Sequence, residues 1–160
     1  MSSNGSGPLV EIEHLKVYFP IKSGIVLDRH VGDIRAVDDV SLKISRGETV
    51  GLVGESGCGK STVAKLLVAL EKPTGGTIRY KGEDVARMGG RALKRYRREV
   101  QIIFQDPYGS LNPRMTVGDI VAEGWSVHAD VAPRKGRLQR TQELLERVGL
   151  NPDFVNRYPH

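Results

Sequence analysis

Apolar and polar residues alternate along the first part of the chain, and this period of two predicts half-buried β-strands. The alternation runs over residues 10–19, where Pro20 is expected to end the strand, and it resumes over residues 36–44. Residues 21–33, between these two runs, are mixed in character and predict a loop or a loose hairpin. A shorter strand is predicted over residues 77–80, between two glycine-containing turns. The N-terminal part should therefore be an antiparallel β region.

The middle of the chain combines strand-like and helix-like patterns. Residues 48–53 are predicted as a strand that leads into a glycine-rich turn, and the helical pattern of residues 63–70 follows that turn. Residues 91–98 predict a basic helix, and the β-branched residues of the segment 99–104 predict another strand. This order of strands and helices indicates an α/β fold.

The last part of the chain predicts helices separated by irregular segments. Two prolines and a glycine exclude regular structure over residues 105–113. Residues 116–125 have the pattern of a capped helix start, and residues 137–148 predict an amphipathic helix with Gly149 as its C-terminal cap. The expected apolar stripe of this last helix consists of Leu138, Leu144, Leu145 and Val148.

Length and composition fit one globular domain or a piece of a larger one. The 160 residues are 39% hydrophobic and 27% charged, and no apolar run approaches the roughly 18 residues that span a bilayer. Residues 1–8 are small and polar, so we expect a disordered lead-in rather than a secretory signal. The single cysteine, Cys58, cannot form an internal disulfide, which agrees with a reducing compartment. The formal net charge of +5 permits an anionic partner without identifying one.

The glycine-rich turn carries the chemistry of this chain. Gly54 to Ser61 matches the phosphate-binding pattern G-x-x-x-x-G-K-[ST]. Its three glycines allow positive φ and a close approach of the backbone to a ligand. The amides of residues 57–62 would then form an anion-binding nest at the positive end of the following helix. A chance glycine turn is the alternative, but the strand pattern before it and the helix pattern after it favour a nucleotide-phosphate site.

Two side chains of this loop have predicted roles of their own. Lys60 is expected to reach the β- and γ-phosphates, and the Ser61 hydroxyl is placed to ligate Mg²⁺. Cys58 lies at the N-terminal end of a helix, where a thiolate would be stabilised, although a small loop residue is the simpler interpretation. The predicted binding residues of the loop are Gly54, Glu55, Ser56, Gly57, Cys58, Gly59, Lys60, Ser61 and Thr62.

Three sequence blocks together carry a family resemblance over nearly the whole chain. The first block runs from Arg46-Gly47-Glu48 through the phosphate loop to Thr62. The second is V-Q-I-I-F-Q-D-P at 100–107 followed by S-L-N-P-R at 110–114, and the third is R-Y-P-H at 157–160. With these blocks the sequence resembles the ATP-binding subunit of an ABC transporter, most closely the oligopeptide and dipeptide import branch. The second block is the more selective, because many NTPases share the phosphate loop.

The resemblance implies roles for two residues outside the loop. Phe19 resembles the aromatic residue that stacks on adenine; strand alternation places its rival Tyr18 on the other face, and a plain core aromatic is the alternative. Gln105 resembles the glutamine that contacts Mg²⁺ and the attacking water, with an ordinary surface glutamine as the alternative. The resemblance thus implies that Lys60 and Gln105 are catalytic residues and that Ser61 and Gln105 are metal ligands. The implied cofactors are ATP and Mg²⁺.

The resemblance also implies an architecture and partners. The fold would be that of a P-loop NTPase of the ABC ATPase type, with an antiparallel β subdomain and P-loop core in residues 9–105 and a partial helical subdomain in residues 106–160. The implied partners are a second ABC ATPase subunit in a homo- or heterodimer, integral membrane permease subunits and, indirectly, a substrate-binding protein. No nucleic acid is expected, and the implied location is peripheral, on the cytoplasmic face of the membrane.

The chain departs from the family pattern after the phosphate loop. A Leu-Ser-Gly-Gly-Gln signature, a Walker B strand ending in Asp-Glu and a switch histidine do not occur in these 160 residues. We therefore expect this chain to bind ATP and to hydrolyse it negligibly, whereas the complete subunit would couple hydrolysis to peptide import. Two alternatives stay open: a non-transport ABC ATPase of DNA repair or translation, which the basic residues 87–98 mildly favour, and a truncated nucleotide-binding remnant.

Overall fold

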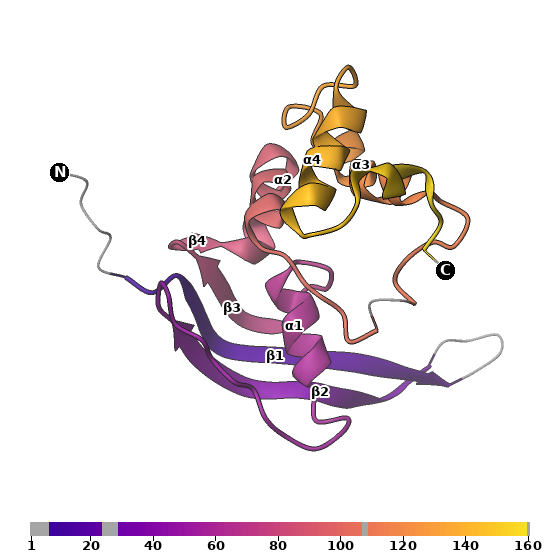
Figure 1. The fold of residues 1–160 in the computed structure, drawn as a ribbon. Helices are drawn as coiled ribbons and strands as arrows, with labels where there is room; N and C mark the ends of the chain where they lie inside the picture. Colours follow the sequence, from indigo (N-terminus) through magenta and orange to yellow (C-terminus); the bar gives the residue numbers. More distant parts are fainter. Residues whose placement is uncertain (1–6, 24–28, 107–108, 160) are drawn as a thin grey trace. The chain divides into compact units, whose positions relative to one another are not determined.

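The computed structural model describes residues 7–23, 29–106 and 109–159. Most of the predicted disordered lead-in, residues 1–8, lies outside the described residues. The chain divides into two compact units, Met1–Ile102 and Ile103–His160. The first unit contains the sheet and the phosphate loop, and the second consists of helices and irregular segments (Figure 1).

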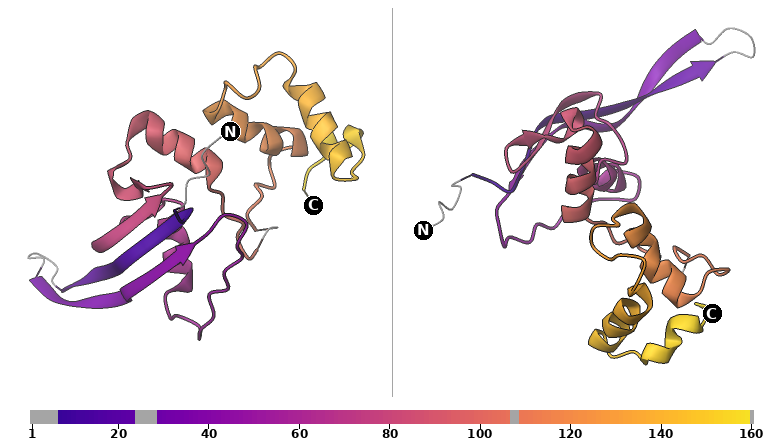
Figure 2. Two further views of the ribbon diagram at one scale, coloured as in Figure 1. Left: turned by 90° about the vertical axis from the view of Figure 1, so that its left-hand side faces the viewer. Right: turned by 90° about the horizontal axis from the view of Figure 1, so that it is seen from above.

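The first unit is built on an antiparallel sheet with the strand order β2-β1-β3-β4. Its strands are β1 (Val10–Ser23), β2 (Arg29–Ile44), β3 (Gly75–Tyr80) and β4 (Glu83–Asp84). β1 pairs with β2 along its whole length, but with β3 only as far as Lys16 opposite Gly75. β1 and β2 therefore continue as a two-stranded ribbon beyond the end of β3 (Figure 2). The antiparallel β region predicted from the alternating pattern is confirmed.

β1 continues through Pro20, so the prediction that this proline ends the strand is wrong. Pro20 lies opposite Asp33 on β2, in the part of β1 that has no β3 neighbour. A residue without an N–H group is tolerated in a strand that has one unpaired edge. Residues 21–33 accordingly form a hairpin whose strands reach Ser23 and Arg29, and the connection between them lies outside the described residues.

The alternation along β1 is broken at His14, which has a positive φ of 47°. The pairing register with β2 shifts between Ile12 and Leu15 and again between Leu15 and Val17. An irregularity of this kind changes which face the following residues occupy. As a result Ile12, Leu15 and Val17 are all buried although a strict period of two would separate the first from the other two.

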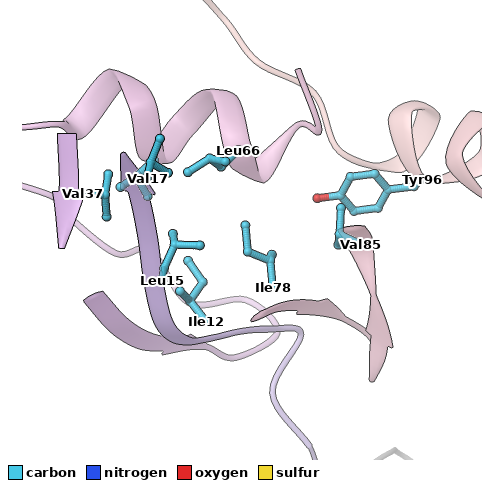
Figure 3. Packing of buried hydrophobic residues seen from close by; sticks show 9 residues of the cluster. Ile12, Leu15, Val17, Val37, Leu66, Ile78, Val85 and Tyr96 are labelled. Atoms are coloured by element: carbon cyan, nitrogen blue, oxygen red, sulfur yellow. The ribbon is translucent and has the colours of Figure 1, made fainter. Parts of the chain in front are cut away.

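Two helices pack with the sheet around one hydrophobic core. They are α1 (Lys60–Leu67) and α2 (Gly90–Glu99), and the short 3-10 turn η1 (Val85–Arg87) precedes α2. The buried residues of this core come from β1, β2, α1, β3, η1 and α2 (Figure 3): Ile12, Leu15, Val17, Val37, Val63, Leu66, Ile78, Val85 and Tyr96. The Tyr96 hydroxyl donates to the carbonyl of Leu67, which fastens α2 to the C-terminal end of α1. Both predicted helices are confirmed.

The two strands predicted around the helices, 48–53 and 99–104, are not strands in this structure. Val53 and Ile103, in the middle of these apolar runs, are 94% and 92% exposed. A strand is defined by the ladder bonds of a neighbour, and β-propensity without a neighbour does not suffice. Within the described residues no strand pairs with either run, and Glu99 at the start of the second run belongs to the helix before it, residues 90–99.

The second unit consists of α3 (Val117–Val127), α4 (Arg137–Arg147) and the 3-10 helix η2 (Pro152–Asn156). Thr116 caps α3 as the sequence predicts, because its hydroxyl accepts from the Asp119 amide at 3.1 Å. The Arg137 guanidinium donates to the Trp125 carbonyl at 2.7 Å and so joins the end of α3 to the start of α4. No helix among the residues that the structure describes is long and apolar enough to cross a membrane.

The predicted apolar stripe of α4 is only partly correct. Leu145 is buried together with Thr141, whereas Leu138 and Val148 are 62% and 70% exposed. The hydroxyl of Thr141 donates to the Arg137 carbonyl at 2.9 Å, so this polar residue is satisfied inside the unit. The helix itself is confirmed, and Gly149, with a φ of 79°, stands just after its end as predicted.

Candidate phosphate-binding site

The loop from Gly54 to Ser61 is largely open to solvent and leads directly into α1. Gly57 and Gly59 have φ values of 83° and 93°, the left-handed conformation that glycine adopts without strain. Gly54 is required for space and not for its φ, because a β-carbon there would lie 2.6 Å from Sγ of Cys58. Gly57 and Gly59 thus supply the left-handed turn of the loop, and Gly54 allows the close approach of Cys58.

Gly59 joins the loop to the sheet. A β-carbon at this position would lie 2.2 Å from the carbonyl oxygen of Ala36 and 3.5 Å from Cγ2 of Val37, both on β2. Only glycine permits this approach, and Gly59 is also the N-cap of α1. The β2 strand therefore sets the place at which α1 begins.

The Lys60 ammonium folds back over its own loop. Its Nζ donates to the carbonyl oxygens of Gly54 at 2.7 Å and Glu55 at 2.5 Å, and it lies 3.4 Å from Sγ of Cys58. These partners are neutral dipoles, which bind a cation more weakly than a phosphate oxygen does. A polyphosphate can therefore replace the two carbonyl groups as the acceptor of the Lys60 protons.

The first turn of α1 presents backbone amides that have no acceptor inside the helix. The first intrahelical bond runs from the Val63 amide to the Gly59 carbonyl at 3.0 Å, so the amides of Lys60, Ser61 and Thr62 precede it. No side chain caps this end, and no acidic residue lies in the first turn. An anion at this point would accept from the amides and would be favoured by the helix dipole.

Phe19 lies on β1, and its side chain is 43% exposed. Its cross-strand partner is Ile34 on β2, which is 58% exposed, so the two apolar side chains share one face of the ribbon. Ile34 stands two residues before Ala36, the residue that touches Gly59. Phe19 is therefore not the core aromatic of the alternative interpretation, and it lies on the strands that carry the phosphate loop.

Tyr18 makes its side-chain contacts on the face of the ribbon opposite to Phe19. Its hydroxyl donates to the Asp38 carboxylate at 2.5 Å, and the Arg35 guanidinium lies 5.5 Å from the centre of its ring. The hydrogen bond from Tyr18 lowers the pKa of Asp38, and the same bond raises the pKa of Tyr18. These contacts engage Tyr18, and the role of Phe19 in stacking on a base stays a prediction.

Gln105 lies in the second unit and is exposed. Phe19, the phosphate loop and the start of α1 all belong to the first unit, and the role of Gln105 stays a prediction. Glu55, Ser56 and Cys58 are exposed on the loop, where their backbone rather than their side chains would meet an anion.

Sequence reasoning missed two residues of this site, Ala36 and Ile34. Both owe their place to the β1–β2 register, which depends on irregular pairing at several points along β1. The predicted strand over residues 36–44 includes Ala36 but not Ile34, and the pattern carries no signal for which residue meets the loop. Among the described residues, no cluster of three or more His, Cys, Asp or Glu could hold a metal ion by itself.

The phosphate loop lies within a segment that matches a known protein family. The family model described as ABC transporter matches residues 37–159. The chain belongs to the ABC transporter family. The fold class and the family resemblance drawn from the sequence are thereby confirmed.

Curated ABC transporter relatives match along almost the whole chain. The oligopeptide transport ATP-binding protein OppF of Bacillus subtilis is 50% identical over 95% of this chain and 48% of its own length. AppF, an oligopeptide transport ATP-binding protein of the same organism, is 45% identical over 100% of this chain and 48% of its own. The dipeptide transport ATP-binding protein DppF of Escherichia coli is 40% identical over 96% of this chain and 45% of its own. The chain spans about half the length of these relatives.

A solved ABC structure has the same fold. The ATP-binding cassette MJ0796, described as a dimer in a post-hydrolysis state with ADP and Pi, superimposes with a TM-score of 0.67 at 26% identity. The match covers 94% of this chain and 61% of that one.

Proposed function

We propose that this chain is the nucleotide-binding part of an ATPase subunit that powers peptide import. The observation that carries the proposal is Lys60, whose ammonium lies inside an open glycine loop at the uncapped start of α1 in a chain of the ABC transporter family. Peptides are the proposed cargo because the relatives at 40–50% identity are named as oligopeptide and dipeptide transport proteins.

The donors of the loop fit a polyphosphate. Lys60 would neutralise charge on the β- and γ-phosphates, and the amides of residues 57–62 would donate hydrogen bonds to the remaining phosphate oxygens. The exposed hydroxyl of Ser61 would hold Mg²⁺, which usually completes its shell with phosphate oxygens and water rather than with a protein cage. Phe19 would stack on the adenine, and Gln105 would orient the attacking water.

Bound Mg·ATP supplies a phosphoanhydride bond whose hydrolysis releases the free energy for transport. The signature, the Walker B acid and the switch histidine do not occur in residues 1–160, so we expect hydrolysis by this chain to be negligible. In the complete subunit we propose head-to-tail pairing with a second ATPase subunit and contact with membrane permease subunits at the cytoplasmic face. A substrate-binding protein would deliver the peptide indirectly.

Calorimetric titration with Mg·ATP tests the binding step. Lys60→Ala should weaken the affinity by about tenfold or more, because it removes a charge-assisted contact with the phosphates. Lys65→Ala is the matched control, since it removes the same charge from α1 at a residue that pairs with Glu71 instead. Equal affinity of wild type and Lys60→Ala would overturn the proposed site. Steady ATP turnover by the pure wild-type chain, lost in Lys60→Ala, would overturn the expectation of negligible hydrolysis.

A second candidate is an ABC ATPase that acts on nucleic acid, and the basic segment around α2 is the observation that favours it. This helix buries its one aromatic residue, Tyr96, which is 3% exposed and so is not available to stack on bases. Co-purification separates the two candidates. Membrane subunits recovered with the subunit favour transport, whereas nucleic acid recovered in their place favours the second candidate.

A further inference from the structure

The positive charge of this chain is concentrated in one short segment. Residues 87–99 contain six Lys or Arg and one Glu, a net charge of +5. The whole chain also has a formal net charge of +5, from 24 basic and 19 acidic residues, so the rest of the molecule contains 18 of each sign. The charge is therefore a property of the η1–α2 segment and not of the surface in general.

The helix arranges these cations on one side. Arg91, Lys94, Arg95 and Arg98 follow the spacing that places side chains on one helical face, and all four are exposed. We call these four residues the basic face of α2. Arg87 flanks it in the preceding turn with a side chain that is 88% exposed.

The opposite side of α2 holds the helix in place. Tyr96 is buried in the core and donates to the Leu67 carbonyl, and the Arg97 guanidinium donates to the Ala69 carbonyl at 2.7 Å. Arg97 is thus occupied by the fold, whereas Arg91 and Lys94 of the basic face are exposed. A helix fixed in this way presents its cations without further ordering.

The basic face has few acidic partners of its own. The Arg95 guanidinium lies 3.8 Å from the Glu83 carboxylate in an exposed pair of the kind that contributes little, and the exposed Arg87 lies 3.2 Å from the half-buried Asp84. Arg91 and Lys94 form no ion pair within the part of the chain that the structure describes. The face therefore retains positive charge that an external anion can neutralise.

We propose that the basic face of α2 docks on anionic lipid head groups at a bilayer surface. A row of cations on an exposed helix matches a plane of phosphates, and clusters of four to eight Lys or Arg on a helix are typical of anionic-lipid contacts. The one aromatic residue among these cations, Tyr96, is buried, and no amide side chain lies between them, which disfavours reading of nucleic-acid bases. The contact is peripheral and electrostatic, because the face has no apolar residue that could insert. It goes beyond the proposed binding of ATP and adds a direct contact between the subunit and lipid.

Vesicle co-sedimentation of the full chain tests this proposal. Wild type should bind vesicles of mixed phosphatidylglycerol and phosphatidylcholine, and it should not bind phosphatidylcholine alone. The bound fraction should fall sharply between about 50 mM and about 500 mM NaCl, because salt screens the contact. The double variant Arg91→Glu/Lys94→Glu should lower the affinity by about tenfold or more.

The double variant Arg134→Glu/Lys135→Glu is the matched control. It changes the net charge by the same amount at exposed residues of the second unit, so it should keep most of the binding. The conservative variant Arg91→Lys should also keep it, and unchanged thermal unfolding of every variant shows that the fold is intact. Equal loss in the α2 variant and in the control would overturn the proposal. So would failure of wild type to bind anionic vesicles, or binding to duplex DNA that competes the vesicles away.

Discussion

Gly59 and Ala36 approach so closely that a β-carbon on the glycine would lie 2.2 Å from the alanine carbonyl oxygen. This contact joins the phosphate loop to β2, and it does so at the N-cap of α1. Because Phe19 pairs with Ile34, two residues before Ala36, the same strands carry both the proposed base contact and the support of the loop. The site therefore depends on sheet register as much as on its own motif.

Gly59→Ala should destabilise the first unit by more than about 3 kcal/mol, because it combines a left-handed backbone with a clash against a backbone atom. Gly57→Ala is the matched control. Gly57 has a similar φ of 83°, but its β-carbon would meet nothing within 4 Å, so the cost should be only about 1 kcal/mol. Urea unfolding followed by circular dichroism measures both, and equal destabilisation would show that the Ala36 contact is not formed.

Phe19→Ala should weaken ATP binding by about tenfold through the loss of base stacking, and it should leave the affinity for inorganic tripolyphosphate unchanged. Stability should change little, because the side chain is already 43% exposed. Tyr18→Phe, which removes the bond to Asp38 on the other face, should not affect ATP affinity. Calorimetric titration of each variant with both ligands makes the comparison. A parallel loss of ATP and tripolyphosphate affinity in Phe19→Ala would contradict the assignment.

Alkylation of Cys58 with N-ethylmaleimide should obstruct phosphate binding. The thiol is exposed, yet its sulfur lies 3.4 Å from the Lys60 ammonium and packs closely over Gly54, so an adduct would fill the loop. ATP affinity should fall in proportion to the modified fraction determined by mass spectrometry. Cys58→Ser should bind ATP normally and resist the reagent. Unchanged affinity at full modification would refute the prediction.

Tyr96 should make the first unit sensitive to alkaline pH. Burial raises the pKa of Tyr96 to about 12, so the folded chain keeps this proton to a higher pH than the unfolded chain, whose tyrosine titrates near its ordinary value of 10. Stability from this group is complete below about pH 10 and decreases by about 2 to 3 kcal/mol as the pH rises towards 12. Urea unfolding between these pH values measures the slope.

Tyr96→Phe is the comparison that isolates this group from the other residues that titrate at high pH. The variant should be less stable at neutral pH by about 1 to 3 kcal/mol, because the Leu67 carbonyl loses its donor. It should also show a shallower decrease of stability above pH 10 than wild type does. Identical slopes for the two proteins would mean that the tyrosine is not buried in solution.

The local sequence patterns of this chain predict most of its helices correctly. The basic helix with Tyr96 inside and the capped helix at Thr116 appear where periodicity and capping place them, and the helix after the phosphate loop forms but spans Lys60–Leu67 instead of residues 63–70. Predictions failed where an element depends on a remote partner. The runs around Val53 and Ile103 have the composition of strands and no strand beside them in the described chain, and Leu138 of α4 is mostly exposed.

The sequence by itself determined the phosphate loop, because a left-handed turn, a close backbone approach and a lysine at a helix start each require particular residues at fixed spacing. It also determined the family, whose model matches residues 37–159. Three features came from the folded chain and not from any local pattern: Ala36 supports Gly59, Ile34 stands beside Phe19, and Pro20 lies within a strand. These facts follow from the register of two long strands, and register is set by contacts between residues far apart in the chain, which no local pattern contains.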